Sequence, residues 1–338
     1  ELFKEIAVRA EQKENRTKKL LQMVKRTISF LIEKRVEKEN AYIDSIKWNK
    51  DVVSKLNASI LHMDDYEKER AAAIRDAYRA IKEEVKAEAE VRLPEILRGC
   101  SSLVAETSDF RKIHLHINEE MNRRMQSFFD EEILPKYYAN LENWLKDAKL
   151  ELVQSKQYLD EMSETFNNLY GEEKIKLKGD FKVLDDWQRD INRMTIGTTI
   201  EQENIFLRNT PSQLLLKGAG KVFGAIPQNK SMLYNQYKKL IENEDYKDTV
   251  HSVISKYMLP FDVFEKGIER DLKLFFSQAE RELAAKVAEG ETEIKSKEKL
   301  LLIMREKPEI YRDAITLFEI RLRQYEWMLE SEKEMKYV

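Results

Sequence analysis

The first 93 residues of this chain contain neither proline nor glycine. Pro94 and Gly99 are the first of each, so nothing before them interrupts a continuous helix. The whole chain of 338 residues holds only 9 glycines and 6 prolines, and 36% of its residues are charged. Compact α/β enzymes need many glycine-bearing turns, whereas long thin helical bundles expose much surface and need many charges. The sequence therefore predicts an all-α fold: an elongated antiparallel bundle of about four long helices with an irregular helical tip.

Apolar residues recur at alternating steps of four and three, which is the pattern of helices that pack against other helices. Between Tyr42 and Met63 this pattern includes one polar member, Asn49. The longest regular pattern runs from Leu141 to Leu169 and predicts a helix of about eight turns. Shorter patterns predict three further helices, at 113–128, 261–283 and 315–329.

Proline and glycine indicate where these helices end. We predict a kink or turn around Pro94 and Gly99, a break at Pro135, and an end of the central helix at Gly171. Gly290 is expected to interrupt the helices that follow. Together with Gly179 and Pro260, which lie at the limits of the irregular middle, these positions suggest four segments: outgoing helices at 1–135, a central helix at 136–180, an irregular tip region at 181–258, and returning helices at 259–338.

The segment from Asn204 to Ile241 contains no aspartate or glutamate, although the chain carries 62 acidic residues and a net charge of −3. Its basic residues are Arg208, Lys217, Lys221, Lys230, Lys238 and Lys239. Anionic lipid surfaces attract basic residues, and their acyl boundary takes up apolar side chains. The segment combines both kinds of residue. The sequence therefore predicts a membrane-binding site formed by Leu214, Leu215, Leu216, Lys217, Lys221, Val222, Phe223, Ile226 and Lys230.

The same apolar residues can instead form a small core at the tip, with the lysines in solvent, because apolar stripes are usually core. The missing acids favour the membrane interpretation. No stretch approaches the roughly 20 apolar residues that a transmembrane helix needs, so we expect binding at the membrane surface.

Motifs for catalysis, cofactors and metals are incomplete in this sequence. A phosphate-binding loop, G-x-x-x-x-G-K-[ST], would need glycine in place of Leu215 and serine or threonine in place of Val222. His114 and His116 are two residues apart, so on a helix they point to different sides and do not indicate a metal site. We therefore expect no enzymatic activity, no cofactor and no metal in this chain. The slightly acidic composition also argues against a nucleic-acid partner.

Three features together resemble the stalk of bacterial dynamin-like proteins. These features are the out-and-back helices, the central insert from Leu214 to Gly224, and a closing helix that contains the stretches 307–312 and 320–327. In that family a neck and trunk of helices carry a membrane-binding paddle, which corresponds to the tip region at 181–258. The family's GTPase domain has no counterpart in these 338 residues, so we expect either that the domain has been removed or that this segment follows it in a longer protein.

The resemblance implies a stalk that mediates self-assembly in a GTP-driven, membrane-remodelling or membrane-fusing protein. Its expected partners are anionic membrane lipids, further copies of the stalk and the GTPase domain of the same protein. A single cysteine favours a reducing compartment, so we expect a cytoplasmic protein that binds the inner face of the cell membrane peripherally. Two alternatives remain open: a helical pore-forming toxin, and a structural coiled-coil scaffold without lipid contact.

Overall fold

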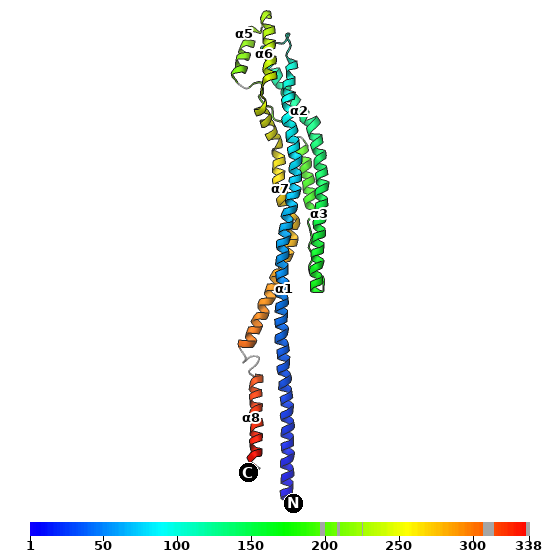
Figure 1. Cartoon of the computed structure of the whole chain (residues 1–338), viewed down its shortest axis with the longest axis vertical. Helices are drawn as coiled ribbons and strands as arrows, with labels where there is room; N and C mark the ends of the chain where they lie inside the picture. Colours follow the sequence, from blue (N-terminus) through cyan, green and yellow to red (C-terminus); the bar gives the residue numbers. More distant parts are fainter. Residues whose placement is uncertain (197–199, 208–209, 225, 307–313, 336–338) are drawn as a thin grey trace. The chain divides into compact units, whose positions relative to one another are not determined.

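The computed structural model describes residues 1–196, 200–207, 210–224, 226–306 and 314–335, except the side chains of 227, 306, 314–316 and 329–335 (Figure 1). The long and medium helices are α1 (Leu2–Gly99), α2 (Ile113–Phe128), α3 (Leu134–Tyr170), α4 (Lys182–Thr195), α5 (Pro211–Phe223), α6 (Lys230–Asn243), α7 (Lys247–Glu306) and α8 (Ala314–Met335). Short helical turns are η1 (Cys100–Leu103), η2 (Phe129–Ile133) and η3 (Pro227–Asn229). No strand occurs in the described residues, so the predicted all-α class is confirmed.

The chain forms two compact units. Unit 1 contains residues 1–61 and 283–338, and unit 2 contains residues 62–282. These limits fall inside α1 and α7, each of which contributes to both units. The units therefore do not coincide with the four segments that proline and glycine suggest.

In unit 1, α1 packs antiparallel against α7 and α8. Its core contains Ile46, Ile294 and Leu301. Asn49, the polar member of the predicted pattern, donates a hydrogen bond from Nδ2 to Glu293 at 2.9 Å. Nearer the N-terminus, Lys25 forms an ion pair of 3.1 Å with Glu326 of α8. Lys297 of α7 donates to Ser45 of α1, so along α7 the residue number rises as the α1 number falls, which establishes the antiparallel direction of these two helices.

In unit 2, the antiparallel packing of α1 against both α3 and α7 encloses an aromatic core. The indole nitrogen of Trp144 on α3 donates to the carbonyl of Ile74 on α1 at 2.9 Å. Tyr78 on α1 donates to the carbonyl of Phe261 on α7 at 3.2 Å. Helix α4 adds Trp187, which is fully buried and lies 5.3 Å from Trp144, centroid to centroid. The core therefore joins residues from four helices.

A buried ion cluster also links α1 to α7 inside unit 2. Lys82 forms ion pairs with Glu265 and, at 2.6 Å, with Asp262. Arg79 binds the other carboxylate oxygen of Glu265 at 2.7 Å. Both Lys82 and Glu265 are buried, so each charge depends on its partners for stabilisation.

The structure confirms the predicted turn at Gly99, where α1 ends, although Pro94 itself lies inside this helix. Two other predicted breaks are wrong. At Pro135 the chain stays helical, because the π-helical turn η2 leads directly into α3. Gly290 lies inside α7, which also contains Pro260 and begins at Lys247, so the predicted tip region at 181–258 ends inside a helix. The end at Gly171 is correct, since this residue caps α3 with φ of 72°.

The segment at 200–206, which is neither helix nor strand, is held along α2 by amide side chains. Asn118, Asn122 and Gln126, spaced four residues apart, accept hydrogen bonds from the backbone amides of Phe206, Glu203 and Ile200 at 2.7–2.9 Å. Residues at this spacing share one helix face. These side chains therefore satisfy backbone amides that have no helical partner, and they fix the segment that leads into α5.

Candidate functional site

Helix α5 contains most of the predicted membrane-binding residues, and it lies beside α6 at one end of unit 2 (Figure 1). The N-terminus of α5 has the residues expected at the beginning of a helix. The hydroxyl of Thr210 accepts a hydrogen bond from the backbone amide of Gln213 at 3.3 Å, and Pro211 occupies the first helical position. The acid-free segment therefore forms a defined helix.

The inner face of α5 is formed by Gln213, Leu216 and Gly220, all of which are buried. The side-chain amide of Gln213 donates to the carbonyl of Ile205 at 3.2 Å, which connects α5 to the irregular segment before it. Beneath the helix, the ring of Phe110 lies 5.7 Å from that of Tyr237 on α6, measured between centroids. This face attaches α5 to unit 2.

Gly220 allows the helix to approach this support closely. A Cβ atom at this position would lie 2.4 Å from the carbonyl oxygen of Phe110, a backbone atom that cannot rotate away. A Cβ at Gly218, two residues earlier, would meet nothing within 4 Å. The two glycines of the Gly-Ala-Gly sequence therefore have different roles.

Replacing each glycine with alanine is expected to have opposite effects. Gly220→Ala should destabilise the packing of α5 by about 1–3 kcal/mol, because the added methyl collides with Phe110. Gly218→Ala should stabilise the helix by up to about 1 kcal/mol, because alanine has the higher helix propensity. Hydrogen exchange of the α5 amides measures both effects. Equal exchange rates in the two variants would contradict this account.

The outer face of α5 is apolar. Leu215 is 76% exposed and Val222 is 66% exposed. They are seven residues apart, which places them two turns apart on one face. Pro211 and Gly218, also exposed, share that face. A surface helix normally turns its polar face to solvent, so this arrangement is the reverse of the usual one.

Basic side chains flank the apolar face. Lys221 is exposed, whereas Lys217 is half-buried, and burial lowers the pKa of the Lys217 ammonium. The imidazole of His114, at the start of α2, is affected by the positive charges of both lysines. Burial, followed by the positive charges of Lys217 and Lys221, lowers the pKa of the His114 imidazole below its ordinary value. The local potential is therefore positive, as the missing acids suggest.

The structure places the predicted site residues in three groups. Leu214, Leu215, Lys221, Val222, Phe223 and Ile226 are exposed. Lys217 and Lys230 are half-buried. Leu216 is only 7% exposed and belongs to the inner face, so it is removed from the candidate surface. Arg208 and Ala225 of the same segment lie outside the described residues.

Two parts of the site were missed by sequence reasoning. Pro211 and Gly218 complete the outer face, and the four-three-four spacing from Pro211 through Leu215 and Gly218 to Val222 is the signal that identifies them. The support from Phe110 was also missed. Phe110 lies more than ninety positions before α5, and nothing in the local sequence links the two.

Within the part of the chain that the structure describes, no helix has the length and apolar character needed to cross a bilayer. The same residues contain no group of three or more histidine, cysteine, aspartate or glutamate side chains that could hold a metal ion. Comparison of the chain with protein-family models, curated proteins and solved structures finds no match.

Proposed function

We propose that this protein binds anionic membranes peripherally through the outer face of α5 and the turn that follows it. The single observation that carries the proposal is the exposed apolar face around Leu215 and Val222, which lies in a segment with six basic and no acidic residues. An apolar helix face beside lysines matches the boundary between lipid head groups and acyl chains.

The expected binding energy suits a peripheral protein. Insertion of two large apolar side chains contributes about 3–6 kcal/mol. Two lysines close to an anionic surface add about 2 kcal/mol. The sum corresponds to reversible binding no tighter than about micromolar for one chain, and several linked chains would bind far more strongly.

We extend the proposal to self-association of a stalk in a dynamin-like, membrane-remodelling GTPase. Unit 1 supports this extension, because it leaves several large apolar side chains exposed, including Phe3 and Phe30 on α1 and Phe318 and Trp327 on α8. Exposed apolar side chains that gather into one patch mark a protein–protein interaction site. Further copies of the stalk, or a GTPase domain elsewhere in the same protein, would cover them. The proposed location is the inner face of the cell membrane.

Co-sedimentation with vesicles tests the proposed function. The chain should sediment with vesicles of phosphatidylglycerol and phosphatidylcholine and much less with phosphatidylcholine alone. Raising the salt from 0.1 M to 1 M should weaken binding, because the screening length falls from about 10 Å to about 3 Å. Sedimentation that ignores lipid charge would contradict the proposal. Absence of any binding would favour the scaffold alternative, and release of an entrapped dye through discrete pores would favour the toxin alternative.

A further inference from the structure

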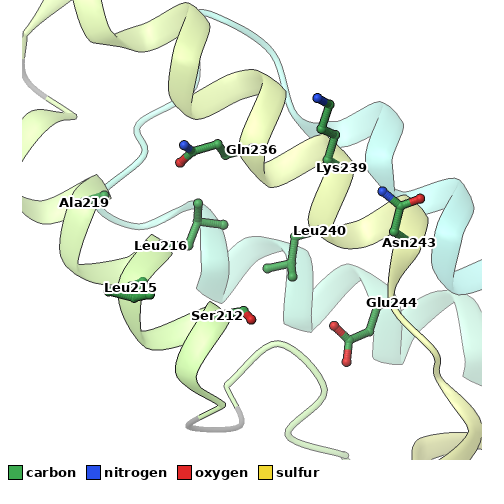
Figure 2. A pocket seen from close by; sticks show the side chains of 9 residues that line it. All are labelled: Ser212, Leu215, Leu216, Ala219, Gln236, Lys239, Leu240, Asn243 and Glu244. Carbon is green, nitrogen blue, oxygen red and sulfur yellow. The ribbon is translucent and has the colours of Figure 1, made fainter.

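An open groove of about 600 Å³ lies between α5 and α6, on the flank of the candidate membrane surface (Figure 2). Its volume is within the range of ligand-binding pockets in proteins, roughly 300–1,000 Å³. Figure 2 shows Leu216 and Leu240 pointing toward one another from the two helices. Leu215 and Ala219 complete the apolar part of the lining.

The residues that line the groove favour an apolar ligand without ring systems. The groove-lining side chains include no aromatic ring that could stack on a planar group. Its polar members, such as Ser212, Gln236 and Glu244, lie at different ends of the groove instead of converging on a single point (Figure 2). Sites for polar metabolites normally carry a few convergent polar groups. A flexible hydrocarbon chain needs no such polar groups for its recognition.

The position of the groove indicates where such a chain comes from. Leu215 belongs both to the groove and to the exposed outer face of α5, so the groove opens onto the proposed lipid-contact surface. Lys239 lies at the rim, inside the acid-free segment. The nearest acid in the lining, Glu244, lies at the end marked by Ser212 (Figure 2). The charge distribution therefore favours an anionic lipid approaching from the Lys239 side.

We propose that the groove between α5 and α6 binds one acyl chain of an anionic membrane lipid. This inference rests on the proposed membrane binding and adds a defined site to it. An acyl chain held between two helices of the protein anchors it more specifically than side-chain insertion alone, because the chain is removed from contact with the remaining bilayer.

The test uses cis-parinaric acid, a linear fatty acid whose fluorescence increases in apolar surroundings, below its micelle concentration and without vesicles. The unaltered chain should increase the fluorescence saturably. Ala219→Phe, which places a ring in the groove, should weaken binding by at least about tenfold. Leu150→Phe adds a ring on α3, where the native side chain is 62% exposed and does not line the groove, and it should bind the probe like the unaltered chain.

Vesicle co-sedimentation of the same variants separates this inference from the proposed function. Ala219→Phe should still sediment with anionic vesicles, because Val222 and the lysines are unchanged. If the unaltered chain does not bind the probe, or if Ala219→Phe binds it equally well, the acyl-chain site is wrong even where vesicle binding persists. If the probe binds in the groove but vesicles do not bind, the proposed function fails and the groove remains a fatty-acid site.

Discussion

Replacing Leu215 and Val222 together with aspartate is expected to weaken binding to anionic vesicles by at least about a hundredfold. The two side chains contribute about 3–6 kcal/mol if both enter the acyl boundary, and each factor of ten corresponds to about 1.4 kcal/mol. The new carboxylates are also repelled by the anionic surface. Because both positions are largely exposed, the fold of unit 2 should tolerate the change. Co-sedimentation gives the affinity, and circular dichroism confirms the helix content.

A matched control exists in the same unit. Leu150 on α3 is 62% exposed and Val263 on α7 is 64% exposed, close to the values of the two tip residues. The double variant Leu150→Asp/Val263→Asp carries the same change in charge and apolar area outside α5. It should bind vesicles nearly as well as the unaltered chain. An equal loss in both double variants would show that total charge, and not the face of α5, governs binding.

Removing Lys82 is expected to destabilise unit 2 by about 3 kcal/mol or more. The Lys82→Ala change leaves the buried carboxylate of Glu265 with only one of its two cationic partners, Arg79. Deleting one member of a buried ion pair typically costs about 3–5 kcal/mol, because the remaining charge has lost its compensation. Lys86, one turn later, forms only an exposed pair of 3.7 Å with Glu83. Lys86→Ala should change stability by less than about 0.5 kcal/mol.

Tryptophan fluorescence during denaturation reports on this unit selectively. Trp144 and Trp187 are buried in unit 2, whereas Trp48 and Trp327, in unit 1, are exposed. The blue-shifted emission therefore comes from the core next to the ion cluster. An unchanged midpoint in Lys82→Ala would mean that the cluster contributes nothing to the packing of α1 on α7.

The loss of stability in the Lys82→Ala variant is expected to depend on pH. Burial raises the pKa of the Glu265 carboxyl, but its hydrogen bonds and ion pairs with Lys82 and Arg79 outweigh burial and hold this pKa below its usual range. A carboxyl with a lowered pKa stabilises the fold above its ordinary pKa of about 4.3, and that stabilisation is lost as the pH falls through the folded value. The stability difference between Lys82→Ala and the unaltered chain should therefore be largest at neutral pH and shrink in acid.

The helices could be predicted because their packing is periodic. Met121 and Met125 on α2, and Leu152 and Leu159 on α3, are buried as their spacing indicates. The ends of the helices were harder to predict, because the low helix propensity of proline and glycine competes with tertiary packing. Leu93 and Leu97 are fully buried on either side of Pro94, and this burial offsets the roughly 3 kcal/mol that proline costs inside a helix.

Gly290 illustrates a second limit of sequence reasoning. Glycine normally weakens a helix, yet here a Cβ atom would lie 2.6 Å from the side chain of Val53. The residue therefore permits close contact between α7 and α1 inside unit 1. A helix-breaking glycine and a close-packing glycine look the same in sequence, and only the partner helix distinguishes them.

The candidate site was only partly predictable for a similar reason. The absence of acidic residues identified the segment, but it could not show which of Leu214, Leu215 and Leu216 are exposed and which are buried. The helix separates them, since successive residues differ by about 100° around its axis. The inner face is set by Gly220, by the distant Phe110 and by the polar Gln213, whose burial depends on the carbonyl of Ile205. Hydrophobicity alone gives no sign of these partners.

Site-specific fluorescence tests the central claim most directly. An environment-sensitive nitrobenzoxadiazole label is attached at Val222→Cys or, as a control, at Val263→Cys; the native Cys100 is fully buried. The account predicts that anionic vesicles shift the Val222 label to shorter wavelengths and expose it to quenchers carried on lipid acyl chains. The Val263 label should not change. A Val222 label that stays in water while the protein is bound to the vesicles would contradict the account.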